Sequence, residues 1–194
     1  MSLPWRDSAE IMLLAPVSTV QDATRAAAAG ARLVDVGPGG ALIPAIRRTL
    51  AGILVCGDYE TADVVGDAAL AARTAAALIC PDQDTAATAV GRGITADRIL
   101  VQTAPAGIGA AVRAGWAVLV DLEEPGAPEP DAPEPDALEE PGTLARTEAI
   151  AAVCAWLGVS VLRTRHLAEI RRCTDMTESI LGRRPPAWAV RGLA

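Results

Sequence analysis

Short apolar runs alternate with alanine-rich stretches along most of this chain, and this alternation restricts the fold more than any other feature. Seven runs are typical of buried strands: residues 11–17, 31–37, 52–58, 76–80, 98–102, 117–122 and 160–163. Their side chains are apolar continuously rather than at every second position, as in parallel strands that are covered on both faces. Helical stretches between consecutive runs supply the crossovers that a parallel sheet requires. The pattern predicts an α/β fold.

Two architectures satisfy this pattern, a (β/α) barrel and a doubly wound sheet. We predict a TIM-barrel-like (β/α) barrel with one βα unit missing or degenerate. Only seven strands are recognisable, residues 61–72 are expected to form a single helix, and 194 residues fall just below the ~200 that such barrels usually need. Because an incomplete barrel exposes a sheet edge, we also expect a homodimer or a hetero-oligomer.

The chain is expected to form one domain, residues 1–194, with a single insert. Residues 123–142 contain the direct repeat APEPD-APEPD and consist almost wholly of proline, alanine and acidic residues. Such a segment cannot bury apolar area, so we expect a flexible acidic, proline-rich insert. It follows the sixth strand and would emerge at the carboxyl end of the sheet, where α/β folds build their sites.

Composition excludes several classes of partner and chemistry. The net charge of −7 argues against nucleic-acid or anionic-membrane partners, and no apolar run is long enough to cross a membrane. The first ten residues include Arg6, Asp7 and Glu10 and do not resemble a secretory signal, so we expect a cytoplasmic protein.

Missing and scattered residue types narrow the chemistry further. There is no lysine, and His166 is the only histidine, which excludes Schiff-base catalysis and a multi-histidine metal site. The four scattered cysteines form neither a zinc pattern nor a disulfide framework and are expected to be buried thiols. We assign no metal ligands.

Polar residues at strand ends are the candidates for a site, because parallel α/β folds bind ligands there. They are Asp35, Asp58, Asp82, Gln102, Thr103, Asp121, Arg163 and Arg165. Arg163 ends an apolar strand, where an unpaired guanidinium would be unfavourable. It therefore needs either an anionic ligand or an ion pair with Asp35 or another strand-end carboxylate.

Three segments resemble the dihydropteroate synthase family, which binds pterins. They are residues 26–40 (AAAAGARLVDVGPGG), Asp58 with residues 62–65, and residues 147–180. The resemblance implies a barrel that joins a pterin pyrophosphate to p-aminobenzoate. It also implies that Asp58 hydrogen-bonds the pterin ring and that Arg163 contacts the pterin or the pyrophosphate. The substrate-binding set that we predict is Asp35, Asp58, Gln102, Asp121, Arg163 and Arg165.

Several family residues are replaced in this chain. The pyrophosphate-binding asparagine falls near Ala15, a pterin-binding aspartate falls at Gln102, and the family lysine falls where Glu123 and Glu124 stand. Arg165 replaces the histidine of the last strand. Because a doubly charged leaving group needs converging cations, a dihydropteroate synthase-like protein with a vestigial pterin-type site and lost or weak synthase activity is expected.

Two alternatives remain at this point. One is an active pterin-dependent transferase of folate biosynthesis that uses compensating residues such as Arg165 or Asp121. The other is an unrelated α/β interaction protein. We assign no catalytic residue and no certain cofactor, and Mg²⁺ is expected only if a pyrophosphate substrate binds.

Overall fold

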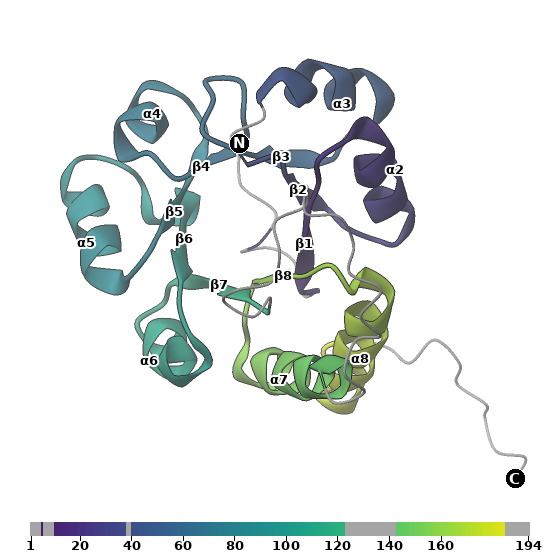
Figure 1. Cartoon of the computed structure of the whole chain (residues 1–194). Coiled ribbons are helices and arrows are strands. Elements are labelled where there is room, and N and C mark those ends of the chain that lie inside the picture. Colours follow the sequence, from purple (N-terminus) through teal and green to yellow (C-terminus); the bar gives the residue numbers. More distant parts are fainter. Residues whose placement is uncertain (1–4, 6–9, 38–39, 123–142, 185–194) are drawn as a thin grey trace, which may run out of the picture.

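Eight parallel strands form a closed barrel in the order of the sequence, with helices around the outside (Figure 1). The computed structural model describes Trp5 and residues 10–37, 40–122 and 143–184. The strands are β1 Met12–Pro16, β2 Leu33–Asp35, β3 Leu54–Cys56, β4 Val64–Val65, β5 Ala77–Cys80, β6 Ile99–Gln102, β7 Ala117–Asp121 and β8 Val161–Arg163. The α-helices are α2 Val20–Ala28, α3 Ile43–Thr49, α4 Ala68–Arg73, α5 Gln83–Gly91, α6 Ile108–Arg113, α7 Thr143–Leu157 and α8 Leu167–Ile180.

Pairing between the first and last strands closes the barrel. In β1, Met12 and Leu14 lie opposite Val161 and Arg163 of β8, and β7 pairs with the other edge of β8. The TIM-barrel prediction is therefore confirmed, and the doubly wound alternative is excluded. The open sheet edge from which we expected an oligomer does not exist, so that reason for an oligomer was wrong.

The strand that the sequence did not reveal is β4, which has only two residues and lies inside the predicted helix at residues 61–72. Residues 57–63 connect β3 directly to β4 without a helix, so one βα unit is degenerate, as expected. Val64 pairs with Cys56 on one side and with Ala77 on the other. Asp63 extends this ladder, because its N–H donates to the Val55 carbonyl (2.8 Å) and its carboxylate accepts the Val55 N–H (2.9 Å). A strand this short has no visible alternation, so its sequence blends into the following helix.

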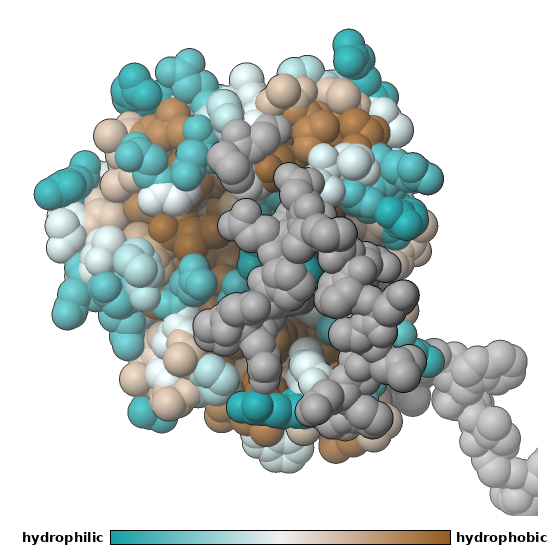
Figure 2. Space-filling view, in the orientation of Figure 1, coloured by the Kyte–Doolittle hydropathy of each residue, from teal (hydrophilic) through white to brown (hydrophobic). Residues whose placement is uncertain are grey.

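Two apolar layers stabilise the barrel. Inward-facing residues of the strands form an interior cluster that includes Leu14, Leu33, Leu100 and Leu119, all 0–2% exposed. A larger cluster packs the outward-facing strand residues against the surrounding helices. In Figure 2, hydrophilic side chains lie along the outer edges of α5 and α2, with hydrophobic residues between the helices and the strands.

Trp5 closes the amino end of the barrel interior. It is 4% exposed and belongs to the interior cluster together with Met12, Ala117 and Val161, the first residues of their strands. Because an indole is wide, one side chain covers an opening that short aliphatic residues would leave unfilled.

Two helices have capping side chains of the types that are favoured at helix N-termini. Thr19 precedes α2, and its hydroxyl oxygen accepts the Asp22 N–H (3.0 Å). The Thr19 hydroxyl donates to the Asp22 carboxylate and is the main reason why the pKa of Asp22 falls to about 2, with Arg25 and Ser18 adding to it against the effect of burial. Asp82, a strand-end candidate, caps α5 by accepting the Thr85 N–H (2.6 Å).

Three further expectations from the sequence concern membrane-spanning helices, the cysteines and the acidic insert. No helix in the described part of the chain is long and apolar enough to cross a membrane. The thiols Cys56, Cys80 and Cys154 are free and buried, as expected, whereas Cys173 is free but only half-buried. The acidic, proline-rich segment at residues 123–142 lies outside the described residues.

Candidate functional site

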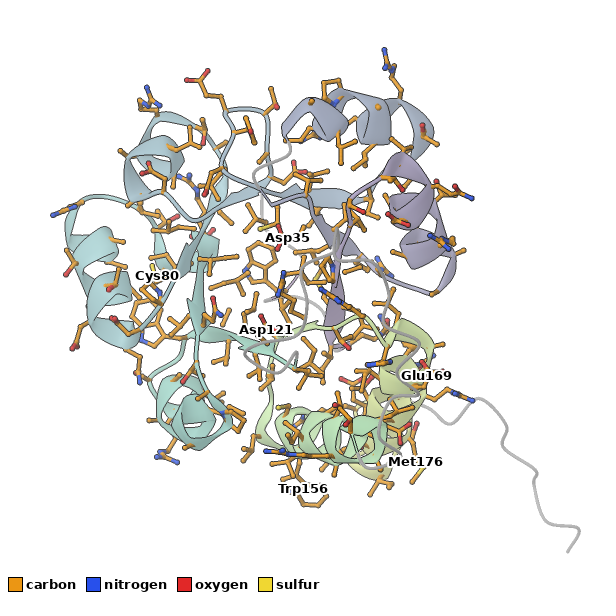
Figure 3. The ribbon with its side chains drawn as sticks, in the orientation of Figure 1. Asp35, Cys80, Asp121, Trp156, Glu169 and Met176 are labelled. Atoms are coloured by element: carbon orange, nitrogen blue, oxygen red, sulfur yellow. The ribbon has the colours of Figure 1, made fainter. Side chains whose placement is uncertain are left out.

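Strand alternation directs three charged side chains into the carboxyl end of the barrel. In β2, β7 and β8 the residue two places earlier (Leu33, Leu119 and Val161) belongs to the interior cluster. Since side chains two apart in a strand share a face, Asp35, Asp121 and Arg163 also face inward. Figure 3 shows Asp35 and Asp121 inside the ring of strands.

Arg163 lies between the two carboxylates. Its Nη1 is 2.8 Å from Asp121 Oδ2, and its Nη2 is 3.3 Å from Asp35 Oδ2. The three side chains are only 20–29% exposed, so solvent screens these contacts less than it would on an open surface. Of the two roles open to Arg163, the structure shows the ion pair, and with two carboxylates rather than one.

The Asp35 carboxylate is also fixed by its own loop. Its Oδ1 accepts the Gly37 N–H at 2.9 Å, and Gly37 has a φ of 53°, a backbone conformation that glycine adopts with little strain. One oxygen of Asp35 is therefore committed to the turn while the other faces Arg163.

Cys56 is the inward strand-end residue that the sequence analysis did not select. It pairs in register with Asp35 across β2 and β3 and is 8% exposed. Burial, followed by the negative charges of Asp35 and Asp58, raises the pKa of Cys56 to about 12, although Arg163 opposes this effect. The residue is therefore a neutral thiol that forms part of the wall of the site. The sequence could have indicated this, because Cys56 lies two residues after Leu54 in the same strand and side chains two apart share a face.

Asp58 and Gln102 lie outside the ion-paired cluster. Asp58 is exposed two residues beyond β3, and its Oδ1 accepts the Gly66 N–H at 2.9 Å, which joins the loops that flank β4. It is close enough for its charge to affect Cys56. Gln102 ends β6 with an exposed side chain. Both remain predicted ligand contacts.

Arg165 belongs to a different part of the surface. It is exposed and lines a cavity of about 370 Å³ between α2 and α8, together with Asp22, Arg25 and Glu169. β8 ends at Arg163, so the alternation that turns Arg163 inward does not extend to Arg165, and the two residues lie in different places.

The cluster at the carboxyl end can accept and donate hydrogen bonds but has a net negative charge. Asp35 and Asp121 contribute two negative charges and Arg163 one positive charge. Carboxylates accept from N–H groups, while guanidinium donates to carbonyl-type oxygens. Within the described ranges, no group of three or more His, Cys, Asp or Glu side chains is arranged to hold a metal ion. The arrangement suits a ligand with several N–H donors better than it suits a phosphate.

Comparison with known proteins gives one match in sequence. No protein-family model matches the chain. Over 83 residues it is 36% identical to the inactive dihydropteroate synthase 2 of Mycobacterium leprae (strain TN). The aligned segment is 43% of this chain but only 27% of that relative.

Solved structures agree with the fold over nearly the whole chain. Rv1207 of Mycobacterium tuberculosis superposes with a TM-score of 0.70 at 20% identity, covering 92% of this chain and 96% of that chain. The dihydropteroate synthase of Coxiella burnetii in complex with pteroic acid gives 0.71 at 14% identity, covering 89% and 95%. The Yersinia pestis enzyme with a pterine-sulfa conjugate gives 0.68 at 13% identity, covering 90% and 95%.

Proposed function

Because this chain is a divergent dihydropteroate synthase-like protein, we propose that it retains a pterin-type binding site at the carboxyl end of its barrel but has lost dihydropteroate synthesis. The observation that carries this proposal is the pairing of Arg163 with both Asp35 and Asp121. A guanidinium held by two carboxylates is largely neutralised. It offers little attraction to a pyrophosphate leaving group, whose departure requires positive charge.

A neutral pterin suits the same cluster better. Its amino and ring N–H groups would donate to a carboxylate of Asp121 or Asp35, and its ring oxygen would accept from Arg163. Asp58 stands at the rim, beside Cys56, and would accept from the outer edge of the ring. Gln102, at the end of β6, would supply an amide in place of a carboxylate.

We expect the free 6-hydroxymethylpterin to bind more tightly than its pyrophosphate with Mg²⁺ in a calorimetric titration of the whole protein. Charge repulsion from the net-negative cluster is the reason. In the same preparation, turnover with p-aminobenzoate should remain at the level of a protein-free blank. Measurable dihydropteroate formation, or tighter binding of the pyrophosphate, would support the active-transferase alternative instead.

Two variants locate the binding. Asp58→Asn should weaken the binding of free pterin several-fold, because an amide NH₂ group cannot accept as the carboxylate does. Asp84→Asn is the matched control, since Asp84 is an exposed aspartate in the first turn of α5. If neither pterin form releases heat, the family's site is gone and the search should turn to protein partners.

We also propose a cytoplasmic homodimer that forms through the outer faces of α7 and α8. The two helices pack against each other, and Trp156 and Met176 lie on their outer side (Figure 3). Trp156, Val153, Met176 and Ile180 are 55–67% exposed, unusually high for large apolar side chains. An apolar patch with a two-helix shape suits a symmetric contact with a second copy. The free thiols agree with a reducing compartment.

The dimer is tested by light scattering after size-exclusion chromatography. Wild type should have twice the mass of the chain, and Trp156→Glu with Met176→Glu should have the mass of one chain, because burying two carboxylates in an apolar contact is unfavourable. Val90→Glu is the control, since Val90 is 40% exposed on α5, across the barrel from α8 (Figure 1). A wild-type protein that is monomeric at all concentrations would remove the proposal.

A further inference from the structure

A second cavity lies at the amino end of the barrel, opposite the cluster around Arg163. Its volume is about 390 Å³, large enough for a small metabolite. The lining residues come from segments that precede β1, β7 and β8 and from the end of α8. Those with polar or aromatic side chains are Trp5, Glu10, Trp116, Ser160, Glu178 and Arg183.

Two deeply buried polar atoms of this lining have no hydrogen-bond partner among the residues that the structure describes. Glu178 is 2% exposed, and its Oε1 accepts the Ile11 N–H (3.2 Å), but Oε2 accepts nothing. Trp5 is 4% exposed, and its Nε1–H donates to nothing. Buried donors and acceptors are rarely left unpaired in folded proteins, because each loses its hydration without compensation. A bound molecule that donates at one point and accepts at another would satisfy both.

The charges of the lining narrow the class of molecule. Burial is the main reason why the pKa of Glu178 is raised, and Asp175 and Glu10 add to it, whereas the Ile11 N–H and Arg171 oppose it. A cation beside Oε2 would therefore be favourable. Arg183 brings positive charge to the same cavity and is held there by donating from Nη1 to the Ala155 carbonyl (2.9 Å).

We propose that this cavity binds a small zwitterion of the α-amino acid type, with its ammonium group on Glu178 Oε2 and its carboxylate on Trp5 Nε1–H and Arg183. The remaining part of the ligand lies against the indole of Trp116, which is partly buried. An amine alone would leave the buried Trp5 N–H without an acceptor, and a carboxylate alone would leave Glu178 Oε2 without a donor among the described residues. The zwitterion satisfies both, and this site is independent of the pterin-type site on the opposite face.

Calorimetry on the full chain with each standard L-amino acid in turn tests the proposal. At least one should bind, and its decarboxylated amine and its deaminated acid should each bind about tenfold more weakly or worse. Glu178→Gln should lower the affinity for the amino acid about tenfold or more, because a charged acceptor is replaced by a neutral amide. Trp5→Phe, which keeps an aromatic ring but removes the N–H, should lower the affinity for the amino acid about threefold or more.

Glu169→Gln is the matched control, because Glu169 lies in the first turn of the same helix, α8, far from its carboxyl end (Figure 3). The Glu169→Gln variant should bind the amino acid with the affinity of wild type. The proposal is overturned if no amino acid binds at millimolar concentration, if the amine binds as well as the amino acid, or if Glu178→Gln binds as wild type does.

A second measurement covers the case in which Glu178→Gln does not fold. The indole N–H resonance of Trp5 in wild type is assigned by its loss in Trp5→Phe. It should shift on addition of the amino acid that binds, because this proton then donates to a carboxylate. An unchanged Trp5 resonance at saturating ligand would place the ligand elsewhere and overturn the proposal.

Discussion

Replacing Arg163 with methionine should lower the free energy of unfolding by about 2–3 kcal/mol at neutral pH. The variant keeps most of the side-chain length but removes the guanidinium that lies between Asp35 and Asp121, whose side chains are 20% and 27% exposed. Removing one partner from a buried pair is strongly destabilising because the other charge is left uncompensated. The loss should be smaller than for a fully buried pair, because water reaches part of these side chains. Urea unfolding followed by circular dichroism gives the measurement.

A triple variant tests whether the lost charge of Arg163 causes the loss of stability. Adding Asp35→Asn and Asp121→Asn to Arg163→Met should recover most of the lost stability, because neutral groups at these positions do not repel each other. A triple variant as unstable as Arg163→Met would mean that the packing of the Arg163 stem, and not its charge, stabilises the site. Wild-type stability in Arg163→Met itself would contradict the ion-paired cluster.

Replacing Trp5 with alanine should lower the free energy of unfolding by about 3–5 kcal/mol. Trp5 is 4% exposed at the amino end of the barrel interior, so the substitution removes a large apolar contact with strand residues such as Met12 and Val161. The cavity that remains cannot collapse easily, because the strands around it are fixed by pairing on both sides. Thermal and urea unfolding at constant protein concentration provide the comparison.

Trp5→Phe separates packing from the indole N–H. Phenylalanine fills most of the space, so the loss should be less than half of that in Trp5→Ala. Equal losses in both variants would indicate that the shape of the indole, rather than buried area, closes the barrel. No loss in Trp5→Ala would show that Trp5 does not seal the interior.

The two ends of the barrel differ in how their charges are satisfied. At the carboxyl end Arg163 is paired with Asp35 and Asp121. At the amino end Glu178 has an oxygen without a described partner inside a cavity. The two proposals are therefore independent, because the barrel strands separate the cluster around Arg163 from the cavity at the amino end.

The sequence by itself determined the fold class, because a parallel sheet is the arrangement that covers continuous apolar strands on both faces. It also narrowed the caps of two helices to Ser18 or Thr19 and to Asp82 or Asp84, since capping depends on residues within one turn of the helix, and the structure uses Thr19 and Asp82. The positions of Asp35, Asp121 and Arg163 at strand ends followed from the apolar runs that precede each of them.

Only the tertiary structure decided which of these residues meet. Ring closure makes β7 and β8 neighbours, and alternation then turns Asp121 and Arg163 to the same interior, whereas Arg165 faces outward. The strand at Val64–Val65 exists because Cys56 and Ala77 pair with it, and a two-residue strand has no periodicity of its own. Trp5 is buried because the open end of a barrel must be filled, a requirement that arises only once distant strands have closed the ring.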